Sequence, residues 1–474
     1  MPIQTNKDMN QTLFRRYRKF GAGGFLIASL VTCHGEPETV NYPFEVPSSV
    51  TALVSVSTAK RTPVNKLLLG LNANWPENLY GKAGYNHPNA QKLIRAFKPS
   101  SLRFPHGVWA NFYDWESDGR RKTDDYSTPY DSSVTNHPTL KYGFDGFHQL
   151  HQELKFDALF TYNLNYDSPE KGVRRLNDRR EKGFEVRWIE LGNEPFWKTQ
   201  RSVATKTLEA YIAVSKAHAA ALKAVDPAIK ISVPVHWRDA GTNPWNQPFF
   251  KETYFDAITV HKHMGGGPET TLFTGQVLAE MARTFRGIFP SHPIWLSEWS
   301  TGKGDNAISV LGMADGYLTL FENPDRYEIA CFFQLNAGHP LIRYDPQTGI
   351  HTKTGCGAAY EMIRDLFEDA QLLETTTETQ QLAEGKDAVR AVSVVRNGER
   401  SLFVINKTPK RVPVQVRVND RMLQKAPILR SLYFDDVNQA KSFALDERPD
   451  VDIPLENNRI VLPPLSLNRI DLSQ

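Results

Sequence analysis

Two glutamates stand at the ends of short apolar runs, and their type and position could do chemistry. Glu194 closes the segment 187–195, Arg-Trp-Ile-Glu-Leu-Gly-Asn-Glu-Pro, and Glu298 follows the run Pro-Ile-Trp-Leu-Ser at 293–297. Two carboxylates that meet across a sugar can cleave its glycosidic bond, one as acid and then base, the other as the attacking group. The pair predicts retaining glycoside hydrolysis if the fold brings the two within about 5–5.5 Å of each other.

The elements that must position these glutamates alternate between apolar strand runs and helical stretches. Helices are expected over 203–225, up to residue 288 before Pro290, and from about 308 to 323. Strands are expected at 66–72, 100–104, 156–162, 186–191, 230–235, 257–261, 293–297 and 329–334. This pattern predicts an α/β fold, a (β/α)₈ TIM barrel, with Glu194 after the fourth strand and Glu298 ending the seventh, both on the catalytic face. A doubly wound sheet with a nucleotide site would need a glycine-rich turn after an early strand, and the sequence has none.

The pattern changes after about residue 367. Apolar runs at 388–395 and 401–406 flank an Asn-Gly turn, 412–418 alternates apolar with polar residues, and 426–433 and 459–472 resemble strands. These runs predict a C-terminal antiparallel β-sandwich, which the alternating stretch 50–57 could join. The predicted domains are a signal peptide at 1–35, an N-terminal segment at 36–64, a catalytic barrel at 65–367 and a sandwich at 368–474.

The N-terminus carries a basic cluster at 15–19 and then a small apolar run at 21–31. This is the pattern of a secretory signal peptide, and it predicts a secreted or periplasmic protein. The alternative is a disordered tail with a chance apolar patch. The segment ends at Cys33 in a sequence that resembles a bacterial lipobox, but Thr32 is a poor residue before such a cysteine. Lipid anchoring is therefore less favoured than cleavage near Gly35.

Composition excludes several function classes. The 474 residues are 40% hydrophobic and 23% charged with a net charge of +3, so nothing favours nucleic-acid binding. No metal-ligand spacing is present, and we expect neither a metal nor a cofactor, because two carboxylates would carry the chemistry. The apolar run near the N-terminus is too short to span a membrane comfortably. Cys331 and Cys356 could pair in an oxidising compartment, and the sequence leaves this open.

Asn193-Glu194-Pro195 after the fourth strand, with a glutamate ending the seventh, resembles clan A of the glycoside hydrolases. The resemblance implies that Glu194 is the acid/base and Glu298 the nucleophile. It also implies that Asn193 hydrogen-bonds the sugar hydroxyl beside the anomeric carbon. Arg103, ending the second strand, matches an arginine near the nucleophile that would keep the carboxylate ionised. A barrel-floor salt bridge is the alternative for Arg103, and turn or salt-bridge roles are the alternative for both glutamates.

A finer resemblance lies in the segments 101–107 and 113–115, Ser-Leu-Arg-Phe-Pro-His-Gly and Tyr-Asp-Trp. They are similar to segments of arabinofuranosidase-like and heparanase-like enzymes, with xylosidase-like enzymes as further relatives, although His106 stands where a glycine is usual. His261 and His263 end the sixth strand, where the clan often has a histidine and then a tyrosine that contacts the nucleophile. This chain has no tyrosine there. Both histidines could equally be ordinary half-buried residues.

Weaker candidates for substrate contact are polar residues and tryptophans at strand ends. His236 ends the fifth strand, and Asn163 and Asn165 follow the third. Tryptophans expected just after strands, where rings could stack on sugars, are Trp75, Trp109, Trp115, Trp197, Trp237, Trp245 and Trp299. Some of these must be simple loop anchors.

The expected partner is a carbohydrate. Lys262, Arg238 and the histidines could favour an acidic or sulfated glycan, although a solvated rim explains the two cations as well. A non-catalytic carbohydrate-binding protein is the second hypothesis, but pure binding needs neither glutamate. A barrel lyase or aldolase is the third, and it would need a Schiff-base lysine with partners or a metal cluster.

Overall fold

The computed structural model describes residues 40–73, 87–120, 141–302, 306–333, 335, 341–345, 347–423, 428–438 and 459–472. All of them belong to one compact unit, Thr39–Gln474. The predicted signal peptide, Cys33 and Trp75 lie outside the described residues.

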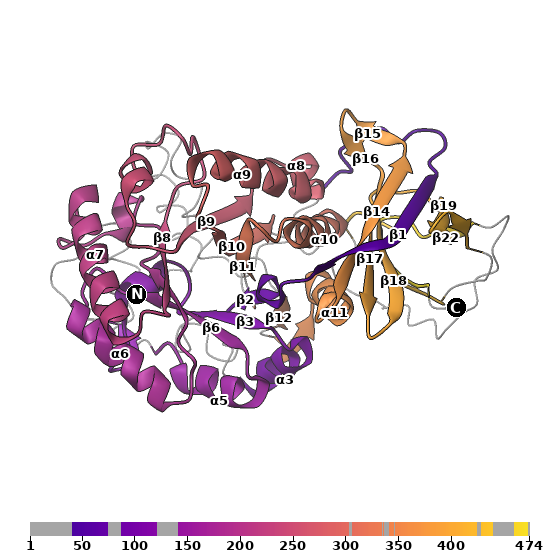
Figure 1. Cartoon of the computed structure of the whole chain (residues 1–474). Coiled ribbons are helices and arrows are strands. Elements are labelled where there is room, and N and C mark those ends of the chain that lie inside the picture. The colour runs from indigo at the N-terminus through magenta and orange to yellow at the C-terminus, as the bar shows by residue number, and fades with distance from the viewer. Residues whose placement is uncertain are drawn as a thin grey trace, which may run out of the picture. The chain divides into compact units, whose positions relative to one another are not determined.

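Eight parallel strands close into a barrel (Figure 1). In chain order they are β2 (Gly70–Asn72), β3 (Ser101–Phe104), β6 (Asp157–Tyr162), β7 (Trp188–Leu191), β8 (Lys230–Pro234), β9 (Ala257–Met264), β10 (Ile294–Thr301) and β11 (Tyr327–Phe332). β11 pairs with β2 to close the ring. The eight predicted strands are these eight, so the (β/α)₈ prediction is confirmed. Its interior is packed, as around the buried Leu159, Trp295 and Ile329.

Helices surround the barrel, and short 3-10 helices shape its loops. The α-helices are α3 (Pro88–Phe97), α5 (Phe144–Leu154), α6 (Pro169–Glu181), α7 (Leu208–Val225), α8 (Pro268–Leu272), α9 (Thr274–Ile288), α10 (Ala307–Glu322) and α11 (Gly355–Phe367). The 3-10 helices are η2 (Lys66–Leu68), η4 (Gly107–Phe112), η5 (Lys198–Gln200) and η6 (Gln247–Lys251). Two-stranded hairpins pair β4 (Tyr113–Asp114) with β5 (Gly119–Arg120), β12 (Ile342–Asp345) with β13 (Ile350–Lys353), and β15 (Gln381–Ala383) with β16 (Lys386–Asp387).

Several predicted boundaries differ from the observed ones. The first half of the predicted strand 66–72 is the 3-10 helix η2, because the Asn65 side chain accepts a hydrogen bond from the Leu67 backbone N–H and caps a turn. The helix predicted from 203 begins at Leu208, where the Thr207 hydroxyl caps the Ala210 N–H. The strand that carries Glu298 does not end there but continues to Thr301.

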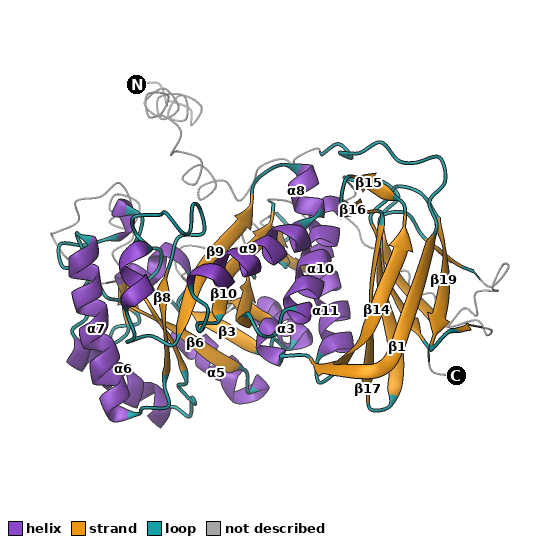
Figure 2. Cartoon of the chain, turned by 45° about the horizontal axis from the view of Figure 1, so that its top comes forward, coloured by secondary structure: helices purple, strands orange, loops and turns teal. Residues whose placement is uncertain are grey.

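A separate nine-stranded sheet, mostly antiparallel, forms the predicted sandwich domain (Figure 2). Its strands are β1 (Ala52–Pro63), β14 (Gln371–Thr379), β17 (Val389–Arg396), β18 (Glu399–Asn406), β19 (Val412–Val418), β20 (Arg421–Met422), β21 (Ile428–Tyr433), β22 (Ile460–Leu462) and β23 (Ser466–Asp471). β1 joins it from the N-terminal side, antiparallel to β14 but parallel to β19. The predicted antiparallel β-sandwich is confirmed, with β1 and β19 as a parallel pair within it.

Helix α10 is buried along nearly its whole length and carries a buried carboxylate, Asp315, toward the sandwich. Asp315 Oδ1 accepts from Lys407 Nζ at 2.8 Å and from Arg390 Nη1 at 2.9 Å. Its Oδ2 accepts from the Gly275 N–H at 2.7 Å. Burial raises the pKa of Asp315, but Lys407 and Arg390 outweigh burial and lower it. Every oxygen of this carboxylate is therefore satisfied.

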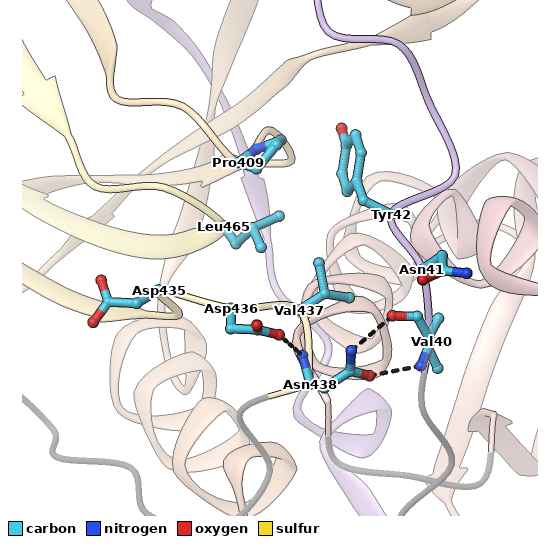
Figure 3. Close-up of a pocket in the computed structure, with 9 residues that line it drawn as sticks. All are labelled: Val40, Asn41, Tyr42, Pro409, Asp435, Asp436, Val437, Asn438 and Leu465. Carbon is cyan, nitrogen blue, oxygen red and sulfur yellow. Dashed lines mark hydrogen bonds between the residues drawn. The ribbon is translucent and has the colours of Figure 1, made fainter.

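A pocket of about 300 Å³ lies between the N-terminal segment and the sandwich (Figure 3). Tyr42, Pro409 and Asn438 are among its lining residues, and Asn438 hydrogen-bonds both backbone groups of Val40. None of its lining residues belongs to the two-glutamate site.

The described part of the chain also informs the cysteine and membrane expectations. Cys331 and Cys356 are buried and not disulfide-bonded. Within that part, no helix has both the length and the apolar character to cross a membrane. Nor does any group of three or more His, Cys, Asp or Glu side chains in it have metal-binding geometry.

Candidate active site

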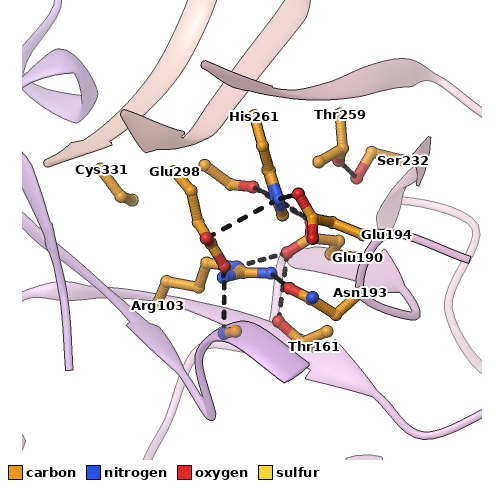
Figure 4. Close-up of polar contacts among 12 residues, drawn as sticks. Arg103, Thr161, Glu190, Asn193, Glu194, Ser232, Thr259, His261, Glu298 and Cys331 are labelled. Carbon is orange, nitrogen blue, oxygen red and sulfur yellow. Dashed lines mark hydrogen bonds and ion pairs between the residues drawn. The ribbon is translucent and has the colours of Figure 1, made fainter. Parts of the chain in front are cut away.

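One carboxylate oxygen of Glu298, on β10, is held by two hydrogen bonds (Figure 4). Its Oε1 accepts from Arg103 Nη1 at 2.6 Å and from the Gly107 N–H at 3.0 Å. Gly107 begins η4 with φ +59°, a conformation that favours glycine and allows its N–H to reach the carboxylate. Strand β3, which β11 and β2 separate from β10 in the barrel, supplies Arg103, whose side chain is fully buried. The carboxylate is thus fixed by a cation and a backbone donor.

The other oxygen of Glu298 has looser neighbours, both histidines of β9. Oε2 lies 3.5 Å from His263 Nε2 and 3.8 Å from His261 Nδ1. His263 is oriented by a 2.8 Å hydrogen bond between its Nδ1 and Ser300 Oγ. Burial raises the pKa of Glu298, but the charges of His261 and Arg103 outweigh burial and hold the pKa well below its usual value. Glu298 is therefore ionised at neutral pH.

Glu194 follows β7 in a strained backbone conformation. Its φ is +41°, in the left-handed region that side-chain-bearing residues seldom adopt, and Gly192 just before it is also left-handed at +83°. Such strain persists only where surrounding contacts enforce it, and it gathers at functional sites. The Gln200 amide donates to Glu194 Oε2 at 2.7 Å, while His261 Nδ1 lies 3.2 Å from Oε1. Unlike Glu298, Glu194 stays partly exposed.

His261 bridges the two glutamates. Its Nδ1 faces both of them, and its Nε2 hydrogen-bonds Ser297 Oγ at 3.0 Å and lies 3.4 Å from Glu190 Oε1. Burial lowers the pKa of His261, but Glu298, Glu190 and Glu194 together raise it to about 10. His261 is therefore an imidazolium at neutral pH. Its Nδ1 lies within 4 Å of a carboxylate oxygen of both Glu194 and Glu298.

Glu190, a fully buried carboxylate within β7, is a site residue that the sequence prediction missed. Its oxygens accept from Arg103 Nε at 2.5 Å, Thr161 Oγ1 at 3.1 Å and Ser297 Oγ at 3.0 Å (Figure 4). Burial raises the pKa of Glu190, but Arg103 and His261 lower it overall. A lone carboxylate in the middle of an apolar strand run was the available signal. Arg103 therefore makes the barrel-floor ion pair and the contact to Glu298 at the same time.

Asn193 lies in the site with both ends of its side chain engaged. Its Oδ1 accepts from Arg103 Nη2 at 2.9 Å, and its Nδ2 donates to Gln200 Oε1 at 2.8 Å. Asn111 on η4 clamps the backbone of Asn193 through hydrogen bonds to both its N–H and its C=O. Asn111 and Gln200 were also missed, because their loop segments carry no periodic pattern. The structure gives Asn193 at least one role, which is to orient Arg103.

His236 lies beside Glu194, and the two asparagines after β6 do not reach the carboxylates. His236 packs edge-on against Phe196 and Trp197, and burial lowers its pKa. Asn163 donates to the Tyr113 carbonyl at 3.0 Å and accepts from the Asn165 N–H. Asn165 in turn holds the loop after β7 through Ser202 and Thr205. The hydrogen bonds of both asparagines brace loops.

The tryptophans expected after strands differ in exposure, and Trp115 is half-buried. Trp197 and Trp237 are 39% and 36% exposed. Trp109 and Trp245 are buried, and Trp245 donates to the Pro234 carbonyl and packs on Tyr211. The expectation that Trp299 follows its strand was wrong: Trp299 lies inside β10, fully buried against Tyr317 and Phe332. Alternation along the extended strand turns Trp299 away from Glu298 and into the layer beneath α10.

The chain thus combines a (β/α)₈ barrel and a β-sandwich with two glutamates, on β10 and just after β7, at the C-terminal ends of the barrel strands. No protein-family model matches the chain. No curated protein sequence matches it either.

Solved structures do match, over nearly the whole chain. An arabinofuranosidase from Thermotoga maritima has a TM-score of 0.72 at 17% identity, covering 90% of this chain and 100% of that one. The family 51 arabinofuranosidase from Xanthomonas axonopodis pv. citri has a TM-score of 0.69 at 15% identity, covering 89% and 100%. A family 44 xyloglucanase from Paenibacillus polymyxa has a TM-score of 0.60 at 16% identity, covering 90% and 100%. At these identities the likeness establishes the fold.

Proposed function

We propose that this protein is a retaining glycoside hydrolase that cleaves oligo- or polysaccharides by double displacement. Glu298 is the nucleophile and Glu194 the acid/base, both in a catalytic barrel spanning residues 65–367. The observation that carries the proposal is the unequal setting of the two carboxylates: Glu298 is buried and held ionised by Arg103 and His261, whereas Glu194 is partly exposed on a strained turn. Two carboxylates in different environments are what separate acid and nucleophile roles.

In the first step Glu298 attacks the anomeric carbon while Glu194 donates its proton to the leaving oxygen. A glycosyl ester forms on Glu298, and the glycosidic bond breaks. Arg103 and the Gly107 N–H hold Oε1, which leaves Oε2, on the side of the two histidines, for attack. Asn193 contributes by fixing Arg103, and in this proposal its second amide hydrogen donates to the sugar hydroxyl beside the anomeric carbon.

In the second step Glu194 takes a proton from water, which attacks the glycosyl ester and releases Glu298. The charges of the cluster fit this cycle. With Glu194 in its neutral, proton-donating form, the carboxylates of Glu190 and Glu298 are balanced by Arg103 and His261. Loss of the Glu194 proton to the leaving group coincides with the loss of charge on Glu298 as the ester forms, so the balance is kept.

The test compares Glu298→Ala and Glu194→Ala with the wild type. The screen begins with the substrates after which the structural neighbours are named, arabinofuranosides and xyloglucan, and extends to plant, algal and animal polysaccharides. Glu298→Ala should abolish turnover. Glu194→Ala should slow turnover of glycans but spare substrates with good leaving groups, which need no proton. Full activity of both variants on every substrate that the wild type cleaves would overturn the proposal.

We also propose that the protein is exported, to the periplasm or beyond, by the N-terminal segment 1–35. The support is the basic cluster followed by a short apolar run. N-terminal sequencing of the mature protein from the native host tests this. A start near Gly35 supports export, a lipidated Cys33 would mean an anchored form, and an intact Met1 in the cytoplasm would contradict it.

A further inference from the structure

Two cations approach one exposed indole beside the candidate active site. Lys262 Nζ lies 3.5 Å from the ring centroid of Trp237, and the guanidinium carbon of Arg238 lies 5.2 Å from the same centroid. Trp237 is 36% exposed. We call Lys262, Arg238 and Trp237 the cationic rim. Cation–π contacts hold both positive groups at the surface of the ring.

The positive charge of the cationic rim is not neutralised within the described part of the chain. Neither Lys262 nor Arg238 forms an ion pair with a carboxylate there, and burial and the charge of Arg238 lower the pKa of Lys262 to about 8. Arg201 also lies over a tryptophan ring, 4.9 Å from the centroid of Trp245. Unlike the two rim cations, its guanidinium is engaged in hydrogen bonds to backbone carbonyls such as that of Pro195. Two like charges held together without a counter-charge repel each other. A bound anion would reduce this repulsion and offset the cost of desolvating the buried charge.

The cationic rim is linked to Glu194 through a chain of aromatic contacts. The His236 ring stacks on Trp237 with an interplanar angle of 12° and meets Trp197 edge-on at 5.4 Å. The backbone N–H of Trp197 donates to the backbone carbonyl of Glu194 at 2.9 Å. The rings of Trp197 and Trp237 therefore both pack against His236, close to the acid/base residue.

The direction of Lys262 places the rim outside the site of bond cleavage. Lys262 lies between His261 and His263 on β9, and successive side chains of a strand point to opposite faces. Since the two histidines face the carboxylates, Lys262 points away from them. The contacts through His236 and Trp197 place the rim near the acid/base residue, next to which the leaving group of a glycosidase lies.

We propose that the cationic rim is a subsite for an anionic sugar, carrying a uronic acid carboxylate or a sulfate ester, on the leaving-group side of Glu194. This assignment rests on the proposed function and names its substrate class. Trp237 and Trp197 offer flat apolar faces to the C–H surface of sugar rings. Lys262 and Arg238 supply charge-assisted hydrogen bonds to the anionic group, which neutral sugars cannot accept with the same strength.

The test measures binding, so it does not depend on turnover. Two matched pairs of ligands are titrated by calorimetry into the Glu298→Ala protein: a glucuronate-substituted xylo-oligosaccharide with its carboxyl-reduced form, and a sulfated galacto-oligosaccharide with its desulfated form. The same titrations use proteins that also carry Lys262→Met with Arg238→Met, or Lys206→Met as control. Lys206 is an exposed lysine on the same loop as Glu194. Its substitution removes one positive charge, where the double variant removes two, and does not touch the rim.

We expect at least one anionic ligand to bind about tenfold more tightly than its uncharged form, the gain of one charge-assisted contact. The Lys262 and Arg238 double variant should lose that preference while binding the uncharged form as before, which also shows that it folds. Lys206→Met should keep the preference. The pair that shows it identifies carboxylate or sulfate as the ligand group.

Equal binding of charged and uncharged forms would overturn the subsite and leave the glycosidase assignment intact. A preference that survives in the double variant would overturn it as well. Failure of every oligosaccharide to bind, together with no turnover in the glycan screen, would count against the proposed function and the subsite together.

Discussion

Two clusters of buried charge in the described part of the chain differ in how fully their carboxylate oxygens are hydrogen-bonded. Asp315 on α10 has each of its oxygens satisfied by Lys407, Arg390 or the Gly275 N–H. Glu298 in the barrel has one oxygen satisfied in the same way, while the other lies 3.5 and 3.8 Å from histidine nitrogens. The first cluster has nothing left to offer a ligand. The second keeps an ionised oxygen available, which suits an attacking group.

Arg103→Met should break the second cluster with the largest effect. It removes the cation that holds Glu298 and leaves Glu190 buried without its partner. We expect kcat to fall about 10³-fold, as when a preorganised electrostatic donor is removed. Steady-state kinetics on the best substrate of the screen measures this, and thermal unfolding checks that the variant folds. A folded variant with wild-type kcat would show that the arginine is only a structural brace.

Asp315→Asn should break the first cluster, with a loss of stability and no loss of activity. Lys407 and Arg390 lose their buried counter-charge, so the free energy of unfolding should fall by about 3–5 kcal/mol. The kcat per folded molecule should stay unchanged, because none of these groups touches the carboxylates of the barrel. Urea denaturation and kinetics below the unfolding midpoint measure both. A large fall in kcat in the fully folded protein would contradict the comparison.

His263→Phe sharpens the comparison at the loosely held oxygen. The imidazole lies 3.5 Å from Glu298 Oε2 and is oriented by Ser300. Removing one weak contact to a charged group should lower kcat by about tenfold. Ser300→Ala should give a smaller loss, and the double variant should be no worse than His263→Phe alone if Ser300 acts through the histidine. Additive losses would mean that the two residues act separately.

The last prediction concerns the pH dependence of stability. The folded-state pKa of His261, about 10, is raised above the 6.5 of an ordinary histidine, so its stabilising contribution is full below pH 6.5 and is lost as pH rises through 10. The stability difference between wild type and His261→Asn should therefore shrink between pH 6.5 and 10. Urea denaturation across this range measures the difference. A constant or widening difference would mean that His261 is neutral in the folded protein.

The barrel was predictable from sequence because most of its strands are short apolar runs that end near polar residues. Glu194 and Glu298 could be selected because such runs deliver them to the same end of parallel strands. Trp299 was misplaced because a strand end cannot be read from composition: β10 continues to Thr301 in register with β9. The 3-10 turn at 66–68 depended on a single capping side chain, Asn65.

The surroundings of the glutamates were less predictable, because their partners come from distant segments. Arg103 reaches Glu190 and Glu298 across 87 and 195 residues of sequence, and Asn111 reaches Gln200 across 89. Nothing local marks such pairs. The role of Glu190 could have been suspected from burial alone, since a carboxylate inside an apolar strand needs a buried cation.

The most direct test of the two-glutamate account is the stereochemistry of azide rescue. Glu298→Ala and Glu194→Ala are each given an activated aryl glycoside and sodium azide, and the glycosyl azide products are assigned by NMR. Azide should replace the missing nucleophile in Glu298→Ala and give the inverted product. In Glu194→Ala it should attack the glycosyl ester on Glu298 and give the retained product. The reverse pairing of variant and configuration would contradict the assignment of nucleophile and acid/base.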